Sequence, residues 1–119
     1  MTFNEDLRNR TKKFAISVIS LIKDEPKKFE VQIVFNQLLR SATSVAANFR
    51  AATRARSKKE FYSKLSIVIE ECDEVCFWLE IIIESKLLSS TKTDLLYKEA
   101  MELVKIFSST RKKIREKYL

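Results

Sequence analysis

Side chains that could carry out catalysis or bind a metal are scarce in this chain. No histidine occurs among its 119 residues, which removes the usual general base, the usual metal ligand and every Ser-His or Cys-His pair. Glycine is also absent, so Gly-rich phosphate loops and nucleophile elbows cannot form in their ordinary way. An enzyme would have to depend on lysines, tyrosines and carboxylates alone. We therefore expect no catalytic residues, no metal and no cofactor.

The two cysteines, Cys72 and Cys76, lie four residues apart on one expected helix. That spacing does not suit a disulfide, and no further Cys or His is present to complete a zinc site. We interpret both as buried free thiols.

Six acids and no base lie between Leu65 and Ser85. Di-metal centres in helical bundles combine such carboxylates with Glu-x-x-His pairs, which a chain without histidine cannot supply. Ion pairing is the better interpretation. If the second and third expected helices are paired through their apolar seams, Arg40 lies opposite Asp73 and Glu74, and we predict that it bridges one of them.

Basic side chains gather in three separated segments. Residues 1–13 carry a net charge of +2, and residues 50–64 and 105–119 carry +5 each, so a chain of +7 overall leaves −5 elsewhere. If the segments meet in space, their field attracts polyanions and is typical of a nucleic-acid binder; the alternative is a solvated basic face. The candidate phosphate contacts are Arg50, Arg54, Arg56, Lys58, Lys59, Arg111, Lys112, Lys113 and Arg115.

The spacing of apolar residues predicts the helices that would bring these segments together. We expect helices over about 4–23, 30–54, 57–85 and 92–117, the middle two with unbroken heptad seams. Short joints require antiparallel neighbours. The expected fold class is therefore all-α, a single-domain, antiparallel up-and-down four-helix bundle over residues 1–119. This alternation places all three basic segments at one end.

Three sequence signals indicate where helices begin. Thr2 with Glu5 and Ser57 with Glu60 have the spacing of capping boxes. Thr91 with Asp94 fits a further cap before the fourth helix. The turn at Thr53 to Arg56 must form without a glycine.

The third expected helix has more apolar residues than one seam needs. From Val75 to Ile83 it is apolar almost all round, so Trp78 and Ile81 either pack under a neighbouring helix or form a subunit interface. We favour a homo-oligomer with Phe77, Trp78 and Ile81 as the candidate interface. No apolar stretch is long enough to span a membrane, and the first residues lack a signal-peptide pattern, so we expect a cytoplasmic protein.

Residues 37–80 resemble a known family. The run QLLRSATSVAANF at 37–49, the run RAATRARSKKEF at 50–61 and the later EE, DE and WLE groups are similar to the 23S rRNA-intervening-sequence proteins, which are bacterial four-helix bundle proteins. The resemblance implies a closed up-and-down bundle, usually a ring-shaped homopentamer. A related branch is the accessory protein of diversity-generating retroelements, which binds nucleic acid and a reverse transcriptase.

The chain departs from the family pattern at one place. Many members carry Ala-Glu-Gly and a further glycine where this chain has Arg50-Ala51-Ala52 and Arg54. The change removes an acid and adds arginines, so no role of that glutamate is carried over.

Two functions follow as hypotheses. The first is a non-catalytic, oligomeric, RNA-associated or nucleic-acid-binding accessory protein that contacts RNA or DNA through its basic end. The alternative is a protein–protein adaptor whose basic end docks an acidic protein partner. The sequence gives neither a partner nor a strand preference.

Overall fold

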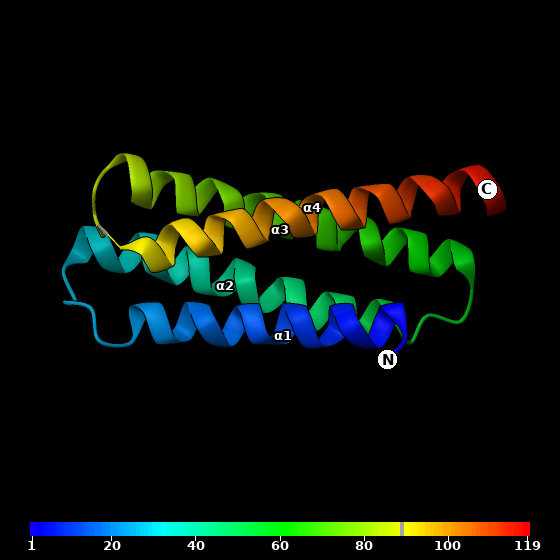
Figure 1. Ribbon diagram of the computed structural model, residues 1–119, viewed down its shortest axis with the longest axis horizontal. Helices are drawn as coiled ribbons and strands as arrows, with labels where there is room; N and C mark the ends of the chain where they lie inside the picture. The colour runs from blue at the N-terminus through cyan, green and yellow to red at the C-terminus, as the bar shows by residue number, and fades with distance from the viewer. Residues whose placement is uncertain (89) are drawn as a thin grey trace.

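The computed structural model describes residues 1–88 and 90–119, which form four antiparallel α-helices (Figure 1). Each helix begins and ends within two residues of the bounds expected from the sequence. The helices are α1 (Phe3–Ile22), α2 (Phe29–Ala52), α3 (Lys58–Glu84) and α4 (Thr91–Tyr118).

The helices pack as an up-and-down bundle of about 47 × 23 × 21 Å, which confirms the expected fold class. Each helix packs along the next one in chain order, and α4 returns to lie beside α1. The α1–α4 contact is the sparsest of the four. Successive helices run in opposite directions and are joined by short connections. The α1–α2 and α3–α4 joints therefore lie at one end of the bundle, and the α2–α3 joint lies at the other.

The predicted heptad seams form the core. Every seam residue of α2 and α3 is buried except Val31 and Phe61, which stand at the helix starts and are partly exposed. The buried seam residues are Phe35, Leu38, Ala42, Val45, Phe49 and Ala52 of α2 and Leu65, Val68, Cys72, Val75, Leu79 and Ile82 of α3. Phe49 of α2 meets Phe107 of α4 across the centre, with ring centroids 5.3 Å apart. Burying these apolar side chains supplies the main driving force for the fold.

Three polar side chains are buried in the part of the chain that the structure describes, namely Thr11, Ser41 and Thr93. The hydroxyls of the first two bond to their own helices. Thr11 donates its hydroxyl to the Leu7 carbonyl at 2.9 Å, and Ser41 donates its hydroxyl to the Gln37 carbonyl at 2.9 Å. A hydroxyl that bonds to its own helix can be buried without a partner from another element. Thr11 thus occupies a buried position on the apolar face of α1 that the spacing of apolar residues alone left empty.

Side chains cap the first turns of α1 and α3. Thr2 Oγ1 accepts from the Glu5 N–H at 3.1 Å, and the Glu5 carboxylate accepts from the Thr2 N–H at 3.1 Å, so the first predicted capping box is confirmed. Ser57 Oγ accepts from the Glu60 N–H at 3.0 Å, but the Glu60 carboxylate lies 3.6 Å from Arg56 Nε. The reciprocal half of the second box is therefore wrong, because the carboxylate is drawn to a charged partner instead.

The cap of α4 lies one residue earlier than the sequence suggested. Ser90 has extended backbone, and its Oγ accepts from the Lys92 N–H at 3.1 Å, while Thr91 is the first helical residue. The predicted cap at Thr91 with Asp94 is wrong. Adjacent serine and threonine are both good caps, and the backbone leaving the α3–α4 joint selects the first.

The turns after α2 and after α3 lack glycine and adopt different backbone conformations. The α2–α3 joint begins at Thr53, in the right-handed helical region, and needs no positive φ. At the end of α3, Lys86 adopts a φ of 58°. Its N–H bonds to the Ile83 carbonyl at 3.2 Å, and the Leu87 N–H bonds to the Ile82 carbonyl at 3.2 Å, which is the Schellman pattern.

Candidate nucleic-acid interface

The three basic segments lie at the same end of the bundle. Figure 1 shows the N-terminus, the α2–α3 joint and the C-terminus together at its right-hand side. A hollow of about 420 Å³ is lined by residues from all three, including Asn4, Arg56 and Ile114. We call residues 1–13, 50–64 and 105–119 together the basic pole. The gathering expected from the short joints is therefore present.

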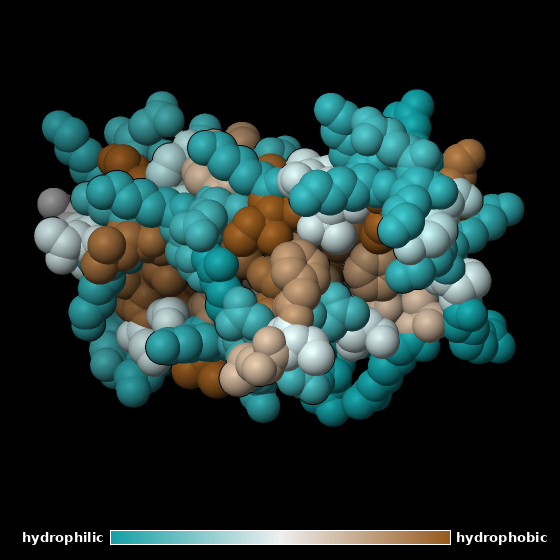
Figure 2. All heavy atoms as spheres, turned by 45° about the vertical axis from the view of Figure 1, so that its right-hand side comes forward, coloured by the Kyte–Doolittle hydropathy of each residue, from teal (hydrophilic) through white to brown (hydrophobic). Residues whose placement is uncertain are grey.

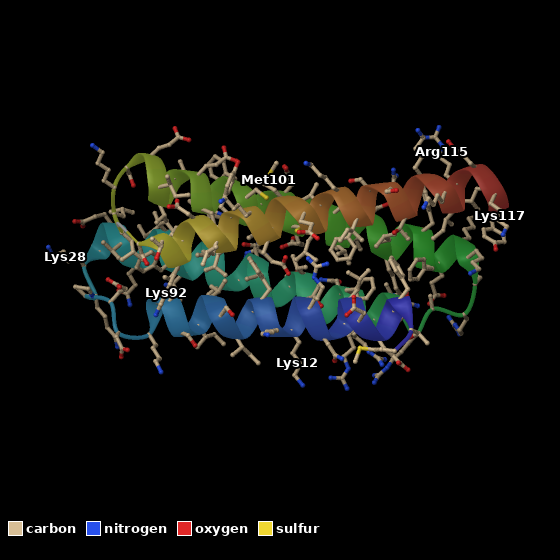
Figure 3. The ribbon with its side chains drawn as sticks, viewed as in Figure 1. Lys12, Lys28, Lys92, Met101, Arg115 and Lys117 are labelled. Atoms are coloured by element: carbon tan, nitrogen blue, oxygen red, sulfur yellow. The ribbon has the colours of Figure 1, made fainter. Side chains whose placement is uncertain are left out.

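Most of the candidate phosphate contacts reach into solvent. Eight of the nine are exposed, and Arg111 is half-buried. Among the residues that the structure describes, Arg56 alone of the nine lies within salt-bridge distance of a carboxylate. Figure 2 brings this end forward and shows it crowded with hydrophilic side chains, and Figure 3 shows Arg115 and Lys117 projecting from the last turns of α4. The cations are thus available to a polyanion.

Arg111 is held in place by two neighbours on α3. Its guanidinium carbon lies 4.3 Å from the centroid of the Tyr62 ring, and its Nε donates to Ser66 Oγ at 2.7 Å. The Ser66 hydroxyl in turn donates to the Tyr62 carbonyl at 3.0 Å. A guanidinium anchored through its ring contact and Nε still has two terminal amino groups, which match the bidentate geometry of a phosphate.

The second tyrosine of the pole also contacts cations. Lys58 Nζ lies 5.1 Å and Lys117 Nζ lies 5.3 Å from the centroid of the Tyr118 ring. This contact links the first residue of α3 to the end of α4. Tyr62 and Tyr118 thus each hold basic side chains against their rings.

One arginine of the pole is neutralised within the bundle. Arg10 Nη2 lies 2.6 Å from Glu99 and 3.3 Å from Glu102, and its Nε also donates to Glu99 at 3.1 Å. The hydrogen bonds to Glu99 raise the pKa of Arg10. This pair bridges α1 and α4, where contact between the helices is sparsest. Arg10 therefore serves the fold and adds little to the outward field of the pole.

Arg40 bridges α2 and α3 through Glu74, one of the two predicted partners, and it has a second partner that the sequence did not indicate. Its Nη2 lies 2.6 Å from Glu74, and its Nη1 lies 3.2 Å from Glu71. The hydrogen bond from Arg40 lowers the pKa of Glu74. The second carboxylate is that of Glu71 rather than Asp73, which is exposed. Residues one turn apart share a helix face, and Glu71 and Glu74 therefore face Arg40 together while Asp73 turns away.

The apolar flank of α3 divides between core and surface. Trp78 packs against the core, and its Nε1 donates to the Glu74 carboxylate at 3.3 Å. Ile81 is half-buried. Phe77 is 49% exposed, and its ring meets Trp78 edge-on with centroids 4.9 Å apart. Of the three candidate interface residues, Phe77 is the one that the bundle leaves most exposed.

The structure also exposes apolar residues that the sequence pattern did not single out. Ile16 and Ile19 of α1 and Ile33 of α2 are each about half exposed, at 53%, 44% and 48%. These three lie on the two helices that do not carry the flank around Phe77. All three lie off the apolar seams of α1 and α2, so the spacing of apolar residues separates them from the core positions.

The thiols and the acids behave as structural groups. Cys72 and Cys76 are buried and free, as predicted. Burial raises the pKa of Cys72 to about 12 and that of Cys76 to about 11. No grouping of three or more metal-ligating side chains is found within residues 1–88 and 90–119.

Over the same residues, none of the helices is both long and apolar enough to cross a membrane.

Two basic residues outside the candidate set join it in space. Arg8 and Lys12 line a groove together with Arg50 and Arg54. The i, i+4 spacing of Arg8 and Lys12 signals a shared face of α1, whereas Arg50 lies in the last turn of α2 and Arg54 in the joint that follows. That the two pairs meet is set by how α1 and α2 are rotated against each other, which no local pattern specifies.

Comparison with known proteins places the chain among its relatives. The family model described as 23S rRNA-intervening sequence protein matches residues 4–109. A similar solved structure is that of a protein of unknown function from the S23 ribosomal protein family of Bacteroides thetaiotaomicron VPI-5482. It is 29% identical with a TM-score of 0.83, and the match covers 93% of this chain and 99% of that one. No curated protein matches. Sequence and fold agree, and the chain belongs to the 23S rRNA-intervening sequence protein family.

Proposed function

We propose that the protein is a non-catalytic accessory protein that binds nucleic acid, RNA in the first place, through its basic pole. The single observation that carries the proposal is the convergence of three basic segments on one end of the bundle. Eight exposed cations and one anchored arginine there lie beside little compensating acid. Family membership associates the chain with 23S rRNA genes by name and supports RNA as the first ligand to test.

We further propose that the protein acts as a homo-oligomer, with Phe77 at the contact between copies. A half-exposed phenylalanine beside a partly buried tryptophan is typical of an interface anchor. A ring of five copies is the assembly that the family resemblance implies. In such a ring, several copies of the pole would contact one nucleic acid at once, and many weak phosphate contacts would together give a higher overall affinity.

Binding measured across salt concentrations tests the proposal. Fluorescently labelled single-stranded and duplex RNA and DNA are titrated with the protein at several salt concentrations. We expect the affinity to fall steeply with salt, with a log–log slope of about −0.7 to −0.9 per phosphate contacted.

A matched pair of variants separates the pole from net charge. Arg54→Glu, Lys58→Glu and Lys113→Glu reverse three charges at the pole. Lys27→Glu, Lys28→Glu and Lys92→Glu make the same change in net charge at the other end, where Figure 3 shows Lys28 and Lys92. We expect a loss of about tenfold or more in affinity for the first set alone. Equal losses for both sets, or affinity that does not respond to salt, would end the proposal.

A second candidate function is a protein–protein adaptor. The exposed apolar residues on α1, α2 and α3 favour it, because apolar side chains gathered on a surface mark sites of contact with protein partners. In this case an acidic partner would remain bound to the tagged protein after nuclease treatment. Loss of that partner on nuclease treatment favours the first function.

A further inference from the structure

A groove runs between α1 and α2 beside the basic pole, with a volume of about 660 Å³. Arg8 and Lys12 line it from the α1 side, and Arg50 and Arg54 line it from the end of α2 and the joint that follows. Figure 3 shows Lys12 projecting from α1 on the side away from α4. The groove therefore lies on a different face from the Arg10–Glu99 contact.

The charges around this groove are of one sign. No acid is among its lining residues, and within the part of the chain that the structure describes none of these four bases lies in a salt bridge. Like charges held close together raise the local potential and attract a counter-anion. Three of the four are arginines, whose planar fork suits phosphate oxygens.

The space between the bases is lined by small and apolar side chains. Ala15 is buried and forms part of the floor, Ala46 is half-buried, and Ile16 is exposed. Such a lining leaves room for a flat, weakly polar group, and the arginine planes beside it can stack on a base. A base can enter a groove only when it is unpaired, because a duplex keeps its bases stacked inside.

We propose that this α1–α2 groove binds single-stranded nucleic acid, with the phosphates at Arg8, Lys12, Arg50 and Arg54 and an unpaired base or ribose against the floor. The inference rests on the proposed function and deepens it, because all four bases belong to the basic pole and the groove gathers them on the α1–α2 face. It adds a strand preference that the charge of the pole alone does not supply.

The test compares two double variants. Arg8→Gln with Lys12→Gln removes the charges on the α1 side of the groove. Lys23→Gln with Lys27→Gln removes the same charge outside the basic pole, where both residues line a different hollow at the far end of α1. Their affinities for a labelled 12-nucleotide single-stranded RNA and for a duplex RNA hairpin are measured across salt concentrations.

We expect the groove variant to lose about tenfold in affinity for the single strand, with a salt slope shallower by about 1.4. Its affinity for the hairpin should change less than about twofold, and the control variant should change neither by more than that. A third variant, Ala47→Leu, fills the groove without changing charge, and we expect it to weaken single-strand binding as well. Circular dichroism and thermal unfolding establish that each variant is folded.

The outcomes separate the two proposals. If the wild-type protein binds no RNA or DNA above a charge-matched control protein, the proposed function itself fails. If the pole variant loses binding while the groove variants keep full single-strand affinity, the groove inference is overturned and the proposed function stands. Equal loss for single strand and hairpin also overturns the groove inference, because it would reduce Arg8 and Lys12 to contributors to a general field.

Discussion

Arg111 is distinguished from the other bases of the pole by how it is held. The exposed lysines and arginines around it must lose side-chain freedom on binding a phosphate, at roughly 0.5–1.5 kcal/mol for each immobilised side chain. The ring of Tyr62 and the hydroxyl of Ser66 already restrict Arg111. We therefore expect Arg111 to lose less side-chain freedom on binding a phosphate than its exposed neighbours.

Replacing Arg111 with lysine keeps the charge but removes the planar contact and the bond to Ser66. We expect Arg111→Lys to weaken RNA binding by about three- to fivefold. Tyr62→Leu should act in the same direction, because it frees an unchanged guanidinium. Lys113→Arg, a charge-conserving change at an exposed neighbour, serves as the control and should have no effect. Wild-type affinity in Arg111→Lys would show that only the charge counts.

The two cysteines give a pH dependence whose sign can be worked out. Burial raises the pKa of Cys72 to about 12 and of Cys76 to about 11, above the ordinary value of 9.0. The folded state then favours the neutral thiol. This contribution is fully present below pH 9 and is lost as the pH rises from there through the folded pKa values.

We expect the wild-type protein to lose more stability between pH 8 and pH 10 than the Cys72→Ala, Cys76→Ala variant. Urea unfolding at both pH values measures the difference. At pH 8 a thiol reagent should modify the folded protein slowly and the unfolded protein rapidly. The same loss of stability in both proteins, or rapid labelling of the native state, would contradict the assignment of buried neutral thiols.

At the scale of elements, the structure restricts the residues at the helix ends more strictly than the residues along the helix seams. The seams of α2 and α3 bury their apolar faces as the heptads predict, and many sequences would satisfy them. The joint after α3 is more demanding, because its Schellman turn places Lys86 at a φ of 58°. A residue with a Cβ atom adopts this conformation at a cost of about 1–2 kcal/mol, which glycine avoids.

Glycine at this position should therefore stabilise the protein. We expect Lys86→Gly to raise the free energy of unfolding by up to about 1 kcal/mol, since the flexibility of glycine in the unfolded state offsets part of the gain. Thermal unfolding measures the change. Ser85→Gly is the control, because Ser85 has right-handed helical backbone and glycine there should destabilise. A lower melting temperature for Lys86→Gly would mean that the Lys86 side chain contributes contacts that outweigh the strain.

At the scale of the whole molecule, the bundle is an electric dipole. Its pole carries a net charge of +12 and the rest of the chain carries −5, and part of that acid lies in ion pairs such as Arg40 with Glu71 and Glu74. A dipole of this kind orients the molecule as it approaches a polyanion. In an oligomer with cyclic symmetry, every pole would face the same side.

The oligomeric state is the property of the whole molecule that can be tested first. We expect the mass in solution, measured by light scattering, to be a multiple of 13.9 kDa, five-fold if the family resemblance holds. Phe77→Ser should shift the protein toward the monomer, whereas Tyr97→Phe, a change within the partly buried α3–α4 contact, should leave the mass unchanged. A wild-type mass of one chain at micromolar concentration would rule out the proposed assembly.

Much of the fold could be predicted from the sequence because its causes are local. A period of 3.6 residues selects the buried face of each helix, and capping residues indicate where helices begin. Thr2 with Glu5 shows this directly. Short joints then force antiparallel neighbours, which is why three segments distant in the sequence could be expected at one end.

The contacts between particular side chains depend on the rotation and axial shift of each helix against the next, and only the tertiary structure determined them. Those quantities arise from the packing of dozens of side chains at once, and no local period encodes them. The rotation and shift of the helices set Glu71 rather than Asp73 opposite Arg40. They turn Phe77 outward while Trp78 packs on the core, and they place Arg111 over the Tyr62 ring. They also bring Arg8 and Lys12 to the groove that Arg50 and Arg54 line. The sequence by itself determined which residues form helices and which end of the bundle is basic, and only the packed structure determined which of those bases share a site.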